Sequence, residues 1–164
     1  MRRLIFIILI SFCFFSCSKK NKYEENLHHF KSLINDINIY FQDSTQNDIQ
    51  IHNYFTEDFV FHSYPAGYKK GIETNKSDYI DGFNKMKDAN MSINIIHSIY
   101  LPGIDETSYK IDGSVRVYSG AIIKMNTNSV EFSGYQTINF QEGVIKEIWE
   151  WSDYGGVKLK LQEK

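Results

Sequence analysis

Two tryptophans and an aspartate stand at alternate positions near the end of the chain: Trp149, Trp151 and Asp153. Alternate side chains of a strand share a face, so these three are expected to point the same way, together with Ile145. A carboxyl group among apolar and aromatic side chains is disfavoured as an anion, and its raised pKa would suit proton abstraction next to a carbonyl group. Alternatively, Asp153 caps the tail that follows or pairs with a lysine, and the sequence leaves both readings open.

Histidines and tyrosines are the other candidate ligand-binding groups. His97 interrupts an otherwise aliphatic strand face, and His62 stands at the end of a β-rich stretch. An imidazole can hydrogen-bond a ligand oxygen or pass a proton near neutral pH, although a lone histidine on such a face can equally be a core residue. Tyr54 and Tyr64 are candidate hydroxyl donors to a ligand.

The first residues have the pattern of an export signal. Arg2 and Arg3 precede an apolar run over 4–15, which is too short for a transmembrane helix. Ser16-Cys17, followed by polar residues, resembles a lipobox. The expected organisation is a signal peptide over 1–16, a lipidated Cys17 with its tether over 17–22, and one domain over 23–164. The acyl chains on Cys17 would anchor the domain to a membrane. By analogy with sorting signals, Ser18 favours the outer membrane with the domain facing the periplasm.

Composition excludes several function classes for the mature chain. Cys13 leaves with the signal, so no disulfide framework or thiol nucleophile remains for the domain. The formal charge of −2 becomes −4 when Arg2 and Arg3 are removed, so the mature chain is not expected to attract nucleic acid electrostatically. The histidines are scattered, so no metal site is expected. No phosphate-binding glycine loop is present, and no cofactor is predicted.

Periodicity divides the domain into helices first and strands afterwards. Apolar residues at steps of four and three predict a helix over 23–41, and two further helices are predicted over 48–55 and 77–88. Strand patterns cover 59–64, 91–101, 109–125, 129–140 and 144–153. Turns are expected at 102–103 and at 142–143. This order predicts an α+β fold in which a curved antiparallel sheet wraps around the helices as a cone and leaves a cavity at its open end.

Three stretches carry a family resemblance: 54–62, the Gly71-Ile72 step with the helix after it, and 145–157. They resemble the SnoaL-like branch of the nuclear transport factor 2-like (NTF2-like) superfamily. The resemblance implies a cone-shaped α+β roll, with Asp153 at the position of the general acid/base of SnoaL-like cyclases and His62 at the family's histidine of the first strand. The superfamily includes cyclases, isomerases, dehydratases and binding domains, so fold alone does not choose among them.

Three functions remain open from the sequence. The first is a domain that binds a small apolar or amphipathic molecule in the cone, with Trp149, Trp151, His97, Tyr54 and Tyr64 as ligand contacts. The second is an enzyme of the polyketide cyclase, isomerase or dehydratase type that uses Asp153 and His62 as an acid/base pair. The third is an interaction module that forms a homodimer through the outer face of the sheet.

Overall fold

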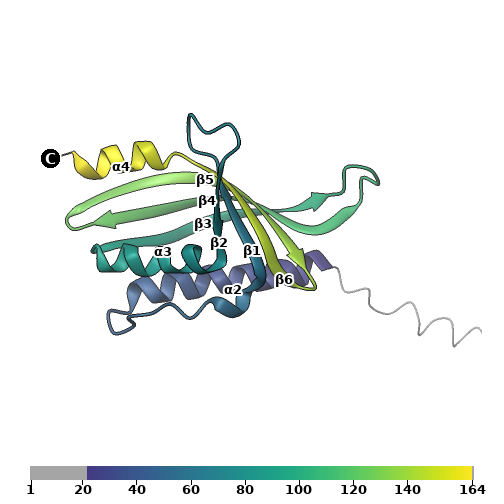
Figure 1. The fold of residues 1–164 in the computed structure, drawn as a ribbon, viewed down its shortest axis with the longest axis horizontal. Coiled ribbons are helices and arrows are strands. Elements are labelled where there is room, and N and C mark those ends of the chain that lie inside the picture. Colours follow the sequence, from purple (N-terminus) through teal and green to yellow (C-terminus); the bar gives the residue numbers. More distant parts are fainter. Residues whose placement is uncertain (1–21, 164) are drawn as a thin grey trace, which may run out of the picture.

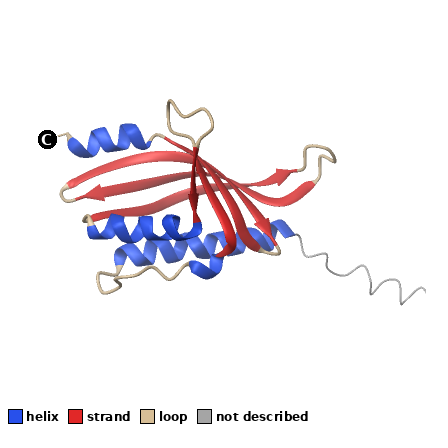
Figure 2. Cartoon of the chain, in the orientation of Figure 1, coloured by secondary structure: helices blue, strands red, loops and turns tan. Residues whose placement is uncertain are grey.

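The structure is a computed structural model and describes residues 22–163. The predicted signal peptide and Cys17 lie outside the described residues. Helices and strands are shown in Figures 1 and 2, and their bounds are α2 Lys22–Gln42, the 3-10 helix η1 His52–Tyr54, β1 Phe55–Ser63, β2 Ile72–Asn75, α3 Lys76–Asp88, β3 Met91–Ile104, β4 Ile111–Met125, β5 Asn128–Gln141, β6 Val144–Ser152 and α4 Tyr154–Gln162. Within these bounds, no helix has the length and apolar character needed to cross a bilayer.

The sheet has six strands in the order β2-β1-β6-β5-β4-β3. It curves over α2 and α3, which cover one face (Figure 1). The predicted α+β fold is therefore confirmed. The sheet is mixed rather than fully antiparallel, because β1 and β6 run parallel while every other neighbouring pair is antiparallel. The two parallel strands lie far apart in the sequence, so strand patterns alone do not reveal their pairing.

Helix α2 forms because its apolar residues recur on one side. Phe30, Leu33, Ile37 and Tyr40 are all buried, at the three- and four-residue spacing of a helix face. They form one core with Val115 of β4 and residues of the other central strands. This core holds the long helix across the concave face of the sheet.

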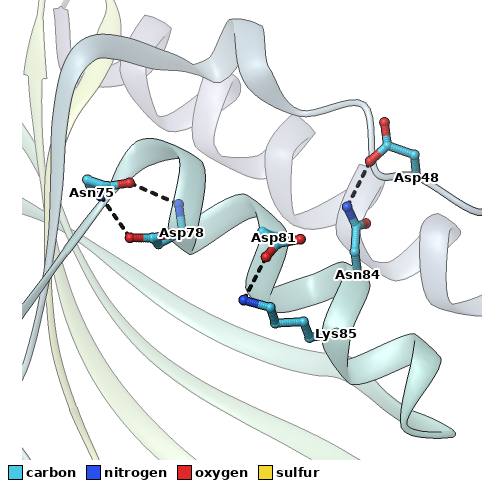
Figure 3. A network of polar contacts seen from close by, with 6 residues as sticks. All are labelled: Asp48, Asn75, Asp78, Asp81, Asn84 and Lys85. Carbon is cyan, nitrogen blue, oxygen red and sulfur yellow. Dashed lines mark hydrogen bonds and ion pairs between the residues drawn. The ribbon is translucent and has the colours of Figure 1, made fainter.

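Helix α3 begins with a side-chain cap and is hydrogen-bonded to the loop that follows α2 (Figure 3). Asn75 accepts a hydrogen bond from the backbone N–H of Asp78 at 2.9 Å, as Asn commonly does at a helix start. Asn84 donates to Asp48 at 2.8 Å and accepts the N–H of Ile49 at 3.1 Å. Of the predicted helix over 48–55, only the 3-10 helix η1 forms. Residues 48–51 pass α3 without helical structure, and the side chain of Asn84 accepts the N–H of Ile49 there.

The predicted turn at 102–103 is also wrong. Strand β3 continues through Pro102 to Ile104, and the chain turns over 105–110. Because β3 is an edge strand of the sheet, a proline without an N–H is tolerated there. The tight turn predicted at 142–143 is confirmed, with Glu142 and Gly143 both at positive φ.

Two irregularities in strand pairing reverse the faces of β3 and β6. Phe140 pairs with Ile145 and Asn139 pairs with Glu147, which leaves Lys146 as an extra residue. The buried positions of β6 are consequently Ile145, then Ile148 and Glu150. One inserted residue moves every later side chain to the opposite face.

The same effect occurs in β3, where the pairing shifts between Ile95 and His97. Ile93 and Ile95 line the interior, whereas Ile99 and Leu101 are exposed on the other side of the shift. The single aliphatic face predicted around His97 is therefore wrong, because the residues before and after the shift lie on opposite faces of the sheet.

Candidate functional site

A cavity of about 550 Å³ lies between the helices and the concave face of the sheet. Helix α2 contributes Phe30 and Leu33, and β1 contributes Phe61. Apolar side chains of α3, β3 and β4 complete most of the wall. Val157 and Leu161 of α4 line it as well, and the exposed residues Lys158 and Gln162 mark where it reaches the surface. The volume falls in the range of cavities that hold small organic molecules.

Glu150 is a buried carboxyl group in this largely apolar cavity. Its side chain projects from β6 and only 6% of the residue is exposed. Gln136 Nε2 donates to Glu150 Oε2 at 2.5 Å. Glu150 Oε1 is buried and accepts no hydrogen bond of ordinary geometry among the described residues, although the Tyr154 hydroxyl interacts with this carboxyl group. A buried polar atom without a partner is costly, so Glu150 Oε1 is a natural position for a ligand group.

Burial raises the pKa of Glu150, and its interactions with Gln136 and Tyr154 offset this effect only in part. Burial also raises the pKa of Tyr79, and Glu150 raises it further. The pKa of Tyr154 is well above its ordinary value for the same two reasons, burial first and Glu150 second. The polar end of the cavity therefore favours a protonated carboxyl group beside two neutral phenols.

A second hollow of about 50 Å³, between α2 and the sheet, also borders Glu150. Ser98, Ser119 and Ser152 are among its lining residues. Its size and its hydroxyl groups suit one small polar group or a water molecule. Glu150 thus lies at the boundary between a large apolar chamber and a small one whose lining mixes apolar side chains with hydroxyl groups.

Four of the sequence-predicted site residues come together, but on the opposite face of the sheet. His62 stacks on Trp149 with ring centroids 4.2 Å apart, and Tyr64 stacks on Trp149 and on Trp151 at 5.9 and 5.0 Å. None of the four lines the 550 Å³ cavity. Trp149 and Trp151 lie on the outer face because the extra residue in β6 shifts every later side chain to the opposite face. His62 follows the cavity-lining Phe61, so it points away from the cavity. The predicted homodimer through this outer face stays a prediction.

His97 and Tyr54 are also placed away from the cavity. The His97 ring lies over Gly120, where a Cβ atom would come within 2.1 Å of it. Tyr54 donates its hydroxyl to Asp36 at 2.6 Å, and its pKa is raised to about 12, chiefly by burial and then by Asp36. Its hydroxyl group is therefore already engaged within the protein.

Asp153 caps helix α4, which was one of the two readings left open by the sequence. Its side chain accepts the backbone N–H of Gly156 at 2.9 Å. The other end of α4 is held by Asn128, whose amide donates to the carbonyl of Leu161 at 2.7 Å. Since α4 carries Val157 and Leu161 into the cavity wall, Asp153 positions one wall of the cavity.

Replacing Asp153 tests its capping role. Asp153→Ala is expected to lower the free energy of unfolding by about 1 kcal/mol, whereas Asp153→Asn keeps a capping oxygen and is expected to change it by a few tenths. Urea denaturation followed by circular dichroism measures both. Equal losses for the two variants would contradict the capping role.

Glu150 and Gln136 are the site residues that sequence reasoning missed. Glu150 stands between two tryptophans, and simple alternation assigns it to solvent. The signal for its inward position is the pairing shift at Lys146, which depends on β5 and is not readable from β6 alone.

Comparison with known proteins identifies the fold. No family model matches the sequence. No curated protein sequence matches it either. Solved structures do match. A candidate polyketide cyclase from Xanthomonas campestris superposes with a TM-score of 0.62 at 9% identity, covering 86% of this chain and 99% of that one.

Two further structures are similar over most of their length. An epoxide hydrolase of the LEH-like type from M. tuberculosis has a TM-score of 0.57 at 11% identity, with 85% and 90% of the two chains covered. An NTF2-like protein from Anabaena variabilis has a TM-score of 0.58 at 14% identity, with 82% and 92% covered. The chain therefore has the NTF2-like fold, in the α+β cone form that SnoaL-like polyketide cyclases share.

Proposed function

We propose that this domain binds a small amphipathic molecule in its cone, with the apolar body in the 550 Å³ cavity and a polar group at Glu150. The observation that carries the proposal is the buried Glu150 Oε1, which no hydrogen bond of ordinary geometry satisfies, beside a wall of aliphatic and aromatic side chains. Burial of the apolar body supplies affinity, and one hydrogen bond to Glu150 orients the ligand.

Matched ten-carbon probes test this proposal: 1-decanol, decylamine and decanoate. The mature chain with Cys17→Ser is titrated with each probe by isothermal calorimetry at pH 7. The alcohol is expected to bind to the protonated Glu150, and the ammonium group of decylamine is expected to bind to it as the carboxylate, with release of its proton. Decanoate is expected to bind at least tenfold more weakly, because its anionic head would have to be desolvated next to Glu150. Equal affinity for all three probes, or no binding of any, contradicts the proposal.

Two variants locate the probe within the protein. Gly82 of α3 lines the cavity and has nothing within 4 Å of the position its Cβ would take, so Gly82→Leu is expected to fill the cavity and abolish binding. Lys85→Leu, at an exposed position of the same helix, is the matched control. Glu150→Gln is expected to weaken decylamine about tenfold, a loss of about 1.4 kcal/mol.

A second candidate function is acid/base catalysis on a carbonyl or epoxide compound. Structural neighbours include a candidate polyketide cyclase and an epoxide hydrolase. The observation that favours catalysis is the raised pKa of Glu150 next to a hollow that could hold a water molecule. In this version Glu150 takes the acid/base role, because Asp153 is engaged as a helix cap and His62 lies in the outer aromatic row. Turnover that survives Glu150→Gln would contradict it.

We further propose that the mature chain is a lipoprotein anchored through Cys17. The support is the sequence pattern over 1–22, in which two arginines and an apolar run precede Ser16-Cys17. Mass spectrometry of the N-terminal peptide is expected to find acyl chains on Cys17. Release of the Cys17→Ser variant into the soluble periplasmic fraction would agree with this, and an unmodified Cys17 would contradict it.

A further inference from the structure

The hairpin that joins β3 to β4 carries exposed apolar side chains at its end. Ile104 is 54% exposed, Tyr109 is 82% exposed and Ile111 is 51% exposed. Ile104 and Ile111 are direct partners across the two strands. Large apolar groups gathered at one projecting tip are unusual for a surface that faces water alone.

The turn at the end of the hairpin is closed by several hydrogen bonds. Asp105 accepts the backbone N–H groups of Ser108 and Thr107 on its side chain at 2.7 and 3.3 Å. Its backbone N–H donates to the carbonyl of Lys110 at 2.9 Å, and its own carbonyl accepts the N–H of Tyr109 at 2.9 Å. These bonds close the turn over residues 106–108 and hold Tyr109 beside it with a positive φ of 55°.

The hairpin lies at the end of the molecule where the described chain begins (Figure 1). Asn26 of α2 donates its buried amide to the carbonyl of Gly113 at 2.8 Å. Lys22 is the first described residue, and its Cβ lies 3.4 Å from the position that a Cβ on Gly113 would take. The base of the hairpin is thus fixed beside the start of α2.

The chain between Lys22 and Cys17 is short. Five residues span at most about 17 Å when fully extended. Tyr109 precedes Gly113 by four positions, which is at most about 13 Å of chain. A lipid on Cys17 and the hairpin tip therefore reach to comparable distances from the same end of the domain.

We propose that the end of the hairpin, with Ile104, Tyr109 and Ile111 beside its turn, contacts the lipid surface that holds Cys17 and orients the domain on it, an inference that rests on the proposed lipid anchor. Tyrosine suits the interface, with its ring among the acyl chains and its hydroxyl at the headgroups. Lys19, Lys20 and Lys22 favour an anionic surface, whereas Asp105, Glu106 and Asp112 at the hairpin limit how deeply it enters.

This orientation places the cavity away from the membrane. Met91 and Met125 line the cavity at the other end of β3 and β4. Fourteen residues of β3 correspond to about 45 Å of strand. The ligand is then expected to enter from the aqueous side rather than directly from the bilayer.

Spin labelling of the mature lipoprotein tests the contact, because the lipidated Cys17 leaves no other thiol. Tyr109→Cys is labelled with a nitroxide in vesicles of phosphatidylethanolamine and phosphatidylglycerol. Tyr68→Cys is the matched control, since Tyr68 is 59% exposed on the loop between β1 and β2. Collision rates with oxygen and with a water-soluble nickel chelate measure the depth of each label.

The label at position 109 is expected to be protected from nickel at least threefold relative to the label at position 68. Equal nickel accessibility in vesicle-bound protein overturns the hairpin contact while the anchor stands. If the protein stays in solution and mass spectrometry finds Cys17 unmodified, both the anchor and the contact are overturned. Ile104→Ser with Ile111→Ser, in the labelled Tyr109→Cys chain, is expected to remove the protection.

Discussion

Glu150→Gln is expected to raise the free energy of unfolding at pH 8 by about 1–3 kcal/mol and to leave it nearly unchanged at pH 4. The buried Glu150 lowers the stability of the folded state unless its carboxyl group is protonated. Glutamine has nearly the same shape, can still accept from Gln136, and does not ionise. The variant therefore removes the cost of a buried charge without opening a cavity.

The sign follows from the raised pKa of Glu150 in the folded state. Below the ordinary glutamate pKa, both the folded and the unfolded chain hold this proton. As the pH rises above it, the unfolded chain releases the proton while the folded chain retains it or buries an anion, so the free energy of unfolding falls. The loss begins near pH 4.5, the ordinary value, and ends once the pH has passed the raised pKa.

The difference between variant and wild type isolates Glu150 from other carboxyl groups. The pKa values of Asp43 and Asp105 are lowered, chiefly by hydrogen bonds from Thr45 and Ser108, so they act in the opposite direction at lower pH. Urea denaturation from pH 4 to pH 9 measures the effect. Glu131→Gln, at an exposed position of β5, is the control and is expected to follow the wild type. A pH-independent difference for Glu150→Gln would contradict the buried, protonated carboxyl.

Lys87→Met is expected to lower the free energy of unfolding by about 2–4 kcal/mol. The Lys87 ammonium donates to three backbone carbonyls, of Tyr40 at 2.6 Å, Asp43 at 2.7 Å and Gln46 at 2.8 Å. It also lies 4.0 Å from the centre of the Tyr40 ring. The last turn of α2 contains no basic residue, so this lysine from α3 satisfies the helix-end carbonyl of Tyr40 and two carbonyls of the loop that follows.

Lys85 is the matched control on the same helix. It forms a single ion pair with Asp81 at 2.7 Å on the exposed surface (Figure 3). Exposed pairs of this kind contribute little, so Lys85→Met is expected to leave the free energy of unfolding nearly unchanged. Thermal and urea denaturation compare the two variants. Similar small losses would show that the Lys87 contacts do not hold α2 against α3.

Local pattern alone predicts much of the architecture. The apolar stripe of α2, the α3 segment and the positions of the last three strands follow from local spacing and turn residues. The capping alternative for Asp153 was also readable, since a short polar side chain before a helical tail is a common start signal. Cys17 is known from the sequence only, and its lipidation stays a prediction.

The position of the site depends on contacts between segments far apart in the chain. The extra residue at Lys146 exists only in the pairing of β6 with β5, and it turns Trp149 outward and Glu150 inward. The shift in β3 does the same for His97. A face assignment from alternation fails at every such bulge, because a one-residue slip exchanges the two faces of a strand. The sequence thus indicates a cone with Asp153 as its candidate carboxyl group, and the packing of the sheet brings Glu150 into the cavity while Asp153 caps α4.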